Sequence, residues 1–193
     1  MLAQGLTFDC IGLAPAAAAK LPPAGALLGL DIKPQGQAIS LRPGPHLAEG
    51  RALPPVVRAL VGLGARLSQL PDLMAVSWRP ARSWMAPGYF RNIASDWLAG
   101  GPFPALGLTT LHRGGDGAMV SLGLSYFIGQ ELRFEPGHAL EPAAIARIAV
   151  RLINELVVSG PLREAAVLTG PGGERLVAEP RPDGAMLSVR VDR

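Results

Sequence analysis

The segment Pro104–Pro136, PALGLTTLHRGGDGAMVSLGLSYFIGQELRFEP, decides the fold of this chain. Two apolar runs flank the turn Gly114–Gly117, in which glycine supplies the positive φ that tight hairpins need. Gly123 and Gly129 bound a corner, and polar and apolar residues alternate after it. We therefore predict two strands joined by a glycine-rich turn, a corner, and a third strand that carries Glu131.

Outward from this segment, three stretches have apolar residues at helical spacing behind a proline. The first begins at Pro54-Pro55 and has an apolar stripe from Val56 to Leu70. The second begins at Pro87 and ends at Gly100, and the third begins at Pro142 and ends at Gly160. The other segments read as strands: Leu2–Leu13, Ala26–Ile32, Gln37–Leu41, Leu73–Trp78, Ala165–Thr169, Arg175–Glu179 and Ala185–Val191. The pattern predicts a single α+β domain over residues 1–193, a mostly antiparallel sheet with about three helices packed on it.

The composition favours a globular protein and sets limits on its partners. Of 193 residues, 49% are hydrophobic, and the net charge is only +3. The arginines are scattered and the only lysines are Lys20 and Lys33, so we expect no nucleic-acid partner.

Cys10 is alone, which excludes an internal disulfide. No leader is recognisable, and the longest apolar run, Ala24–Leu30, is too short to cross a bilayer; we expect a cytoplasmic protein without membrane contact.

The residue types that carry most enzyme chemistry lack the required spacing. His46, His112 and His138 form no metal-binding pair, and we expect neither a metal nor a cofactor. Ser125 lacks the second glycine of a nucleophile elbow, and Cys10 in an apolar strand is typical of a core residue. The turn at Gly114–Gly117 precedes a strand, whereas a phosphate-binding loop precedes a helix.

Two features remain as candidate binding sites. Glu131 shares a strand face with Arg133 and Glu135; it either belongs to a solvated face with ion pairs, or it satisfies buried backbone or an arginine at the Gly129 corner. The segment Trp78–Arg91 interleaves tryptophan and arginine, residues that dominate interface hot spots. We take Arg79, Arg82, Trp84 and Glu131 as candidate binding residues. The alternative is that Trp78 and Trp97 lie in the core and that Trp84 caps the start of the helix that follows.

Several of these motifs resemble an uncharacterised bacterial family, the domain of unknown function numbered forty-two sixty-one. The resemblance covers residues 73–191 and rests on Met74–Trp78, Phe103–Leu108, Gly114–Gly117 and Gly123–Phe134. It implies a bacterial protein with an α+β fold and no known activity. It assigns no catalytic residue.

The absence of an assembled reactive group favours a non-enzymatic protein-interaction or regulatory module. The rival is an enzyme or small-molecule binder with a site built around Glu131 from residues such as His112 and Cys10. A deep polar pocket at Glu131 would favour the rival, and an exposed Trp84 the interaction module. A third alternative is a homo-oligomer that pairs an edge of the final strands.

Overall fold

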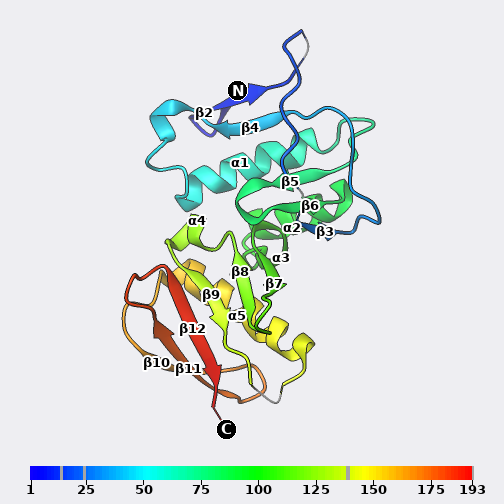
Figure 1. The fold of residues 1–193 in the computed structure, drawn as a ribbon. Coiled ribbons are helices and arrows are strands. Elements are labelled where there is room, and N and C mark those ends of the chain that lie inside the picture. Colours follow the sequence, from blue (N-terminus) through cyan, green and yellow to red (C-terminus); the bar gives the residue numbers. More distant parts are fainter. Residues whose placement is uncertain (14, 24, 138–139, 193) are drawn as a thin grey trace. The chain divides into compact units, whose positions relative to one another are not determined.

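The computed structural model describes residues 1–13, 15–23, 25–137 and 140–192. The chain forms two compact units, unit 1 from Met1 to Gly107 and unit 2 from Leu108 to Arg193 (Figure 1). Three long helices form where we predicted them and most strand pairs are antiparallel, so the α+β class is confirmed. The strands form three sheets where one was predicted. That the whole chain is one domain stays a prediction.

The two long helices of unit 1 are α1 (Pro54–Leu67) and α2 (Pro87–Leu98). Each has proline in its first turn, where the missing N–H would have no helical partner. The predicted stripe ran to Leu70, but α1 ends at Leu67. Pro71 disfavours helical geometry at Leu70, the residue before it. Gly64 gives close packing between the helices, since a Cβ there would lie 3.3 Å from the ring of Phe90.

Unit 1 holds two small sheets. One consists of β1 (Leu2–Ala3), β2 (Leu6–Ile11) and β4 (Ser40–Pro43); in the other, β6 (Ser83–Met85) lies between β3 (Ala26–Leu28) and β5 (Val76–Trp78). Two short 3₁₀ helices, η1 (Pro45–Leu47) and η2 (Arg79–Ala81), belong to this unit. The segment labelled α3 (Ala105–Leu108) leads into unit 2 and is interrupted by non-helical backbone at Leu106 and Gly107. The β3–β6 pair is parallel, and β6 was missed because the arginine-rich segment around it resembles a loop. Phe8 packs with α1 in a buried cluster that Trp78 partly covers.

Unit 2 is built on a six-stranded sheet. Its strand order is β10 (Ala166–Thr169), β11 (Arg175–Pro180), β12 (Met186–Val191), β9 (Glu131–Phe134), β8 (Met119–Leu122) and β7 (Thr110–Arg113). The hairpin β7–β8 and the strand β9 confirm the prediction for Pro104–Pro136, and α4 (Ser125–Ile128) fills the corner. The parallel pairing of β12 with β9 joins this segment to the final meander.

The helix α5 (Pro142–Ser159) lies on one face of this sheet (Figure 1). Side chains that are almost fully buried come from both layers: Leu132, Phe134, Ile145, Ile148, Ile153, Leu176, Leu187 and Val189. The strand residues among them alternate with Arg133 and Ser188, which are only half-buried and lie on the other face. The predicted alternation of the sheet therefore places polar and charged side chains such as Arg133 and Ser188 on the face opposite α5. Among the described residues, no helix has both the length and the apolar character that crossing a bilayer requires.

Candidate functional site

Glu131, the first residue of β9, accepts five hydrogen bonds through its carboxylate. The backbone N–H groups of Gly123, Leu124 and Ser125 donate at 2.8, 3.2 and 3.0 Å. The hydroxyl of Ser125 donates at 2.7 Å, and that of Ser121 donates as well. The carboxylate thus holds the amides that lead into α4, where backbone donors otherwise lack partners.

The glycines around this cluster explain why the chain can form it. Gly123 has a φ of +95°, which allows the chain to leave β8 and turn three successive amides toward Glu131. Gly129 ends α4 with a φ of +75° and sends the chain back into β9. Ser121 also accepts the N–H of Leu132 at 2.8 Å, so the same hydroxyl links β8 to β9. The structure thus places Glu131 as a backbone acceptor at the Gly129 corner, one of the two roles considered from the sequence.

This geometry leaves Glu131 little capacity for reaction chemistry. A carboxylate offers about four lone-pair sites, and five donors already occupy it. His112 is exposed on β7 and Cys10 lies on β2 of unit 1; neither donates to Glu131. Within the described ranges, no three His, Cys, Asp or Glu side chains come close enough to hold a metal ion.

The three histidines occupy unrelated places. His46 in η1 hydrogen-bonds the hydroxyl of Thr7 through a ring nitrogen at 3.1 Å. His112 is on the exposed side of the β7–β8 hairpin. His138 lies outside the residues that the structure describes.

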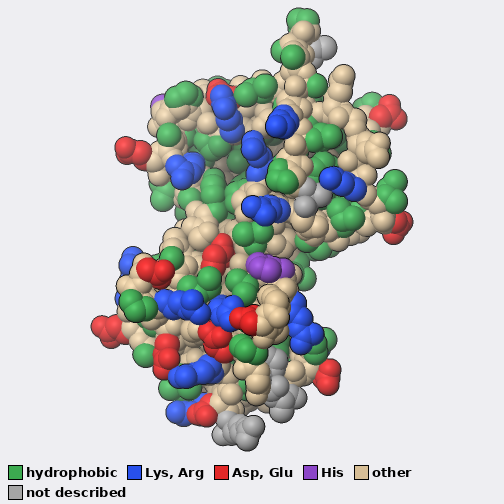
Figure 2. Space-filling view, in the orientation of Figure 1, with side chains coloured by type: hydrophobic (Ala, Val, Ile, Leu, Met, Phe, Trp, Pro, Cys, Tyr) green, Lys and Arg blue, Asp and Glu red, His purple; other side chains and the backbone are tan. Residues whose placement is uncertain are grey.

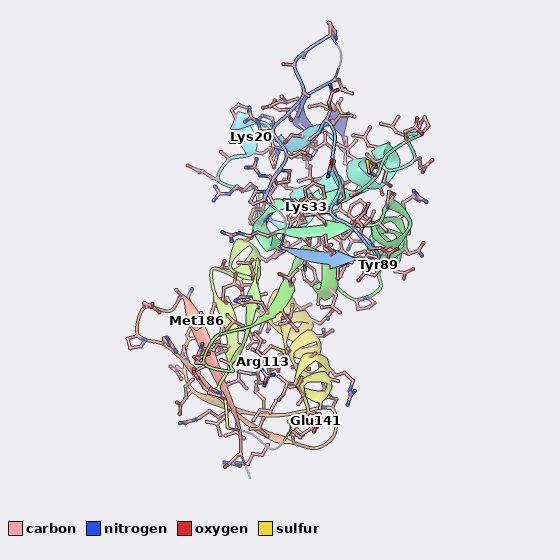
Figure 3. All side chains as sticks on the ribbon, turned by 45° about the vertical axis from the view of Figure 1, so that its right-hand side comes forward. Lys20, Lys33, Tyr89, Arg113, Glu141 and Met186 are labelled. Carbon is pink, nitrogen blue, oxygen red and sulfur yellow. The ribbon has the colours of Figure 1, made fainter. Side chains whose placement is uncertain are left out.

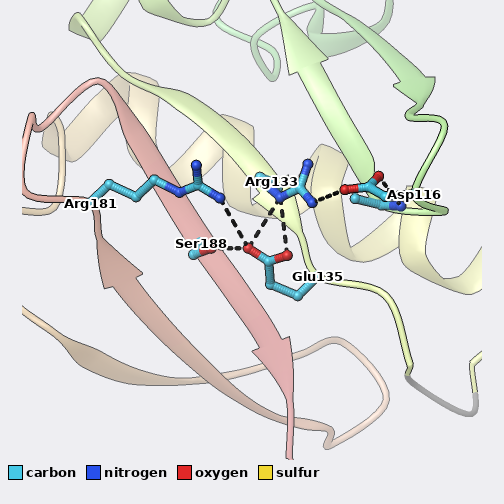
Figure 4. Close-up of polar contacts among 6 residues, drawn as sticks. Asp116, Arg133, Glu135, Arg181 and Ser188 are labelled. Atoms are coloured by element: carbon cyan, nitrogen blue, oxygen red, sulfur yellow. Dashed lines mark hydrogen bonds and ion pairs between the residues drawn. The ribbon is translucent and has the colours of Figure 1, made fainter.

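A charged network crosses the face of the sheet opposite α5 (Figure 4). Arg133 on β9 bridges two carboxylates: it pairs with Asp116 of the β7–β8 turn, and its Nε lies 3.0 Å from Oε2 of Glu135. Glu135 also accepts a hydrogen bond from Ser188 on β12 and has Arg181 at 3.6 Å. The network therefore connects three segments that are distant in sequence.

The network changes the proton affinity of its carboxyl groups. Burial opposes the ionisation of Glu135, but hydrogen bonds from Ser188 and Arg133 and the positive charges of Arg133 and Arg181 outweigh it, so the pKa of Glu135 is lowered. The hydrogen bond from Arg133, followed by that from the N–H of Ala118, lowers the pKa of Asp116. The same two carboxylates raise the pKa of the Arg133 guanidinium. With each charge balanced by a neighbour, the network has the properties of a structural element.

The segment Arg79–Arg82, here called the Arg82 corner, joins β5 to β6 and presents two exposed arginines. Arg82 adopts a left-handed conformation with a φ of +49°, which glycine occupies more readily than arginine. The backbone N–H of Arg82 donates to the carbonyl oxygen of Arg79 at 3.1 Å. The carbonyl oxygen of Arg82 accepts a hydrogen bond from the N–H of Gly25 at 2.9 Å. A Cβ on Gly25 would lie 2.8 Å from that carbonyl oxygen, so the close approach requires glycine there. The backbone of the corner is fixed while the Arg82 side chain faces outward.

Trp84 follows this corner but does not share its exposure. It is the central residue of β6, between Leu27 of β3 and Ser77 of β5, and only 4% of its surface is accessible. Its indole N–H has no hydrogen-bond partner among the described residues. Trp84 is therefore a core residue, and both roles considered for it, an exposed binding residue and a cap of the helix start, were wrong. The arginines remain as candidate binding residues. The structure brings Arg79, Arg82 and Trp84 together on one hairpin of unit 1, whereas Glu131 belongs to unit 2.

The charges of the two units differ in number and in pairing. Unit 1 has nine Lys and Arg residues against five Asp and Glu residues, although the whole chain carries only +3. Exposed cations of unit 1 without a side-chain partner among the described residues are Lys20, Lys33, Arg66, Arg79 and Arg82. Figure 2 shows basic side chains spread over the unit 1 face that carries β5 and β6, with few acidic ones among them. Lys20 and Lys33 lie on the two long connections that flank β3 in the chain (Figure 3).

Comparisons with family models, with curated proteins and with solved structures found no match to this chain. The resemblance to the domain of unknown function stays a prediction. Sequence reasoning selected Glu131 but missed its serine donors, because Ser121 lies in β8 and Ser125 in α4. It also missed Ser188, whose position beside Glu135 depends on the parallel pairing of β12 with β9.

Proposed function

We propose that this protein is a non-enzymatic interaction module whose Arg82 corner binds an acidic segment of a protein partner, in keeping with a regulatory role. The single observation that carries the proposal is the left-handed backbone of Arg82, which is hydrogen-bonded on both sides beneath an exposed side chain. A non-glycine residue in this conformation costs roughly 1 kcal/mol. Strained backbone of this kind clusters at ligand-binding and switch sites.

The surrounding charge supports an acidic partner. Arg79 and Arg82 lie three residues apart on one short turn, and neither has an acidic neighbour to neutralise it among the described residues. Guanidinium groups donate paired hydrogen bonds to carboxylates, and they are favoured in interfaces for that reason. The remaining unpaired cations of unit 1 would steer an acidic partner toward the surface.

The rival function, an enzyme or small-molecule site around Glu131, has less support. It requires a carboxylate that can exchange protons or bind a ligand, and the donors from Ser121 to Ser125 already occupy that of Glu131. We therefore place Glu131 in the framework of unit 2 and not in a reactive site.

Capture from an extract of the source cells tests the proposal. The tagged protein is compared with the double variant Arg79→Ala/Arg82→Ala and with the matched double variant Arg113→Ala/Arg163→Ala. Each double variant removes two exposed arginines that have no side-chain partner among the described residues. We expect a nuclease-resistant protein partner in near-equal amount with the wild type and the matched control, and its loss with the first variant. Equal capture by both variants would refute the Arg82 corner as the binding site.

A further inference from the structure

The two edges of the six-stranded sheet of unit 2 differ in how they are protected. Native sheets commonly protect their edges with charged residues, proline, bulges or covering segments, because an open edge offers unpaired backbone groups to other chains. The edge strand β7 ends with His112 and Arg113, both exposed. The edge strand β10, Ala-Val-Leu-Thr, has no charge and no proline. It runs without a bulge, since each of its residues from Ala166 to Thr169 has one partner on β11.

The outer side of β10 also exposes an apolar side chain. Val167, the second residue of this four-residue strand, has 56% of its surface accessible. Its register partner on β11 is Val177, which is half-buried, so the two valines form a small apolar row at the edge. No described strand pairs with β10 on its free side.

The charges near this edge are balanced. On the neighbouring strands Arg190 pairs with Glu179 at 2.9 Å, and Arg175 pairs with Asp192 at 2.7 Å. The chain entering β10 carries Arg163 and Glu164, so it has one charge of each sign, as does the turn beyond it with Glu174 and Arg175. Because its charges are balanced, the β10 edge has no net charge that would attract a charged peptide. It is suited to pair with another neutral strand edge, such as β10 of a second copy.

We propose that β10 pairs antiparallel with β10 of a second copy of this chain. A two-fold axis between the two strands, beside Val167, lays the apolar row of one copy next to that of the other. It also brings the neutral entry of one strand close to the neutral exit of its partner. This isologous contact closes on itself and removes the open edge of both copies. Because a four-residue strand pair buries little area, the dimer is weak and forms only at high protein concentration. The proposal rests on unit 2 alone and is independent of the Arg82 corner.

Sedimentation velocity of the full chain, from about 5 to about 500 μM, tests this dimer. The test variant is Val167→Lys, which places a charge on the edge. The matched control is Val158→Lys, at another exposed valine with 87% of its surface accessible. We expect a concentration-dependent dimer for the wild type and for Val158→Lys, and a monomer for Val167→Lys with unchanged circular dichroism.

Amide hydrogen exchange at the two ends of this concentration range locates the contact. Peptides covering 166–169 should exchange at least about threefold more slowly at high concentration, and those covering β7 should not change. The proposal would be overturned if the wild type stayed monomeric or if Val167→Lys still formed the dimer. Binding of a different protein to this edge would not rescue it. Arg79→Ala/Arg82→Ala should leave the dimer intact, so that failure of the dimer and failure of the proposed function can be told apart.

Discussion

A single carboxylate, that of Glu131, organises the corner between β8 and β9. In Glu131→Ala the amides of Gly123 and Leu124, both in buried residues, lose their acceptor. Unsatisfied buried donors cost about 1–3 kcal/mol each, and partial solvation of the corner reduces the total. We expect the free energy of unfolding in urea to fall by about 2–4 kcal/mol. The control Glu164→Ala, at an exposed position, should change it by less than about 0.5 kcal/mol. A similar small effect in both variants would show that the hydrogen bonds to Glu131 contribute nothing net.

Trp84 combines a buried ring with an N–H that has no partner among the described residues. Trp84→Ala should lower the free energy of unfolding by about 3–5 kcal/mol through the cavity it leaves. Trp84→Phe keeps most of the packing and removes the unsatisfied donor, so we expect a change within about 1 kcal/mol in either direction. Partner capture by Trp84→Phe should equal that of the wild type. Loss of capture with an intact fold would instead make the indole a binding group.

At the scale of elements, the network around Arg133 connects β9 to β12 and to the β7–β8 turn. The pKa of Glu135 is lowered in the folded protein, so its ionised form stabilises the fold above the unfolded pKa near 4.5. This contribution is lost as the pH falls through the lower, folded pKa, and Asp116 behaves in the same way. Stability should therefore decline as the pH falls below about 5.

Replacing Arg133 tests that pH dependence. In Arg133→Gln the pKa of Glu135 should rise, because the hydrogen bond and the positive charge of Arg133 no longer offset the effect of burial. We expect a loss of about 1 kcal/mol at neutral pH, discounted for solvent exposure, and a shallower decline on acidification. Arg151→Gln removes an exposed pair on α5 and serves as the control. Carboxyl NMR titration and urea unfolding across the acid range measure both effects; an unchanged pH profile in Arg133→Gln would contradict this account.

The elements that the sequence predicted well depend on local patterns. The α5 helix follows from its apolar stripe and its terminal glycine, and the β7–β8 hairpin follows from its turn residues. Glu131 was selected because a carboxylate stood beside a glycine-bounded corner. The parallel pairs β3–β6 and β9–β12 join segments distant in sequence, and nothing local specifies them. The left-handed backbone of Arg82 could not be predicted from the sequence either, because it is held in part by a hydrogen bond from Gly25, which is distant in sequence.

For the whole molecule, the prediction of a single domain can be tested against its two compact units. All three tryptophans, Trp78, Trp84 and Trp97, lie in unit 1, so tryptophan fluorescence follows that unit alone. Circular dichroism in the far ultraviolet follows both units. A single domain predicts coincident urea transitions for the two probes. It also predicts that Glu131→Ala, in unit 2, lowers the midpoint of the fluorescence transition. Separate transitions would show that the units unfold independently.

The central claim, that the Arg82 corner binds an acidic protein segment, is tested most directly by calorimetric titration with the purified captured partner. The account predicts that Arg79→Ala/Arg82→Ala weakens binding by at least about tenfold, which corresponds to about 1.4 kcal/mol. It also predicts that Arg113→Ala/Arg163→Ala weakens binding by less than about twofold, and that added salt weakens the wild-type complex. Equal affinities for the two double variants would contradict the claim.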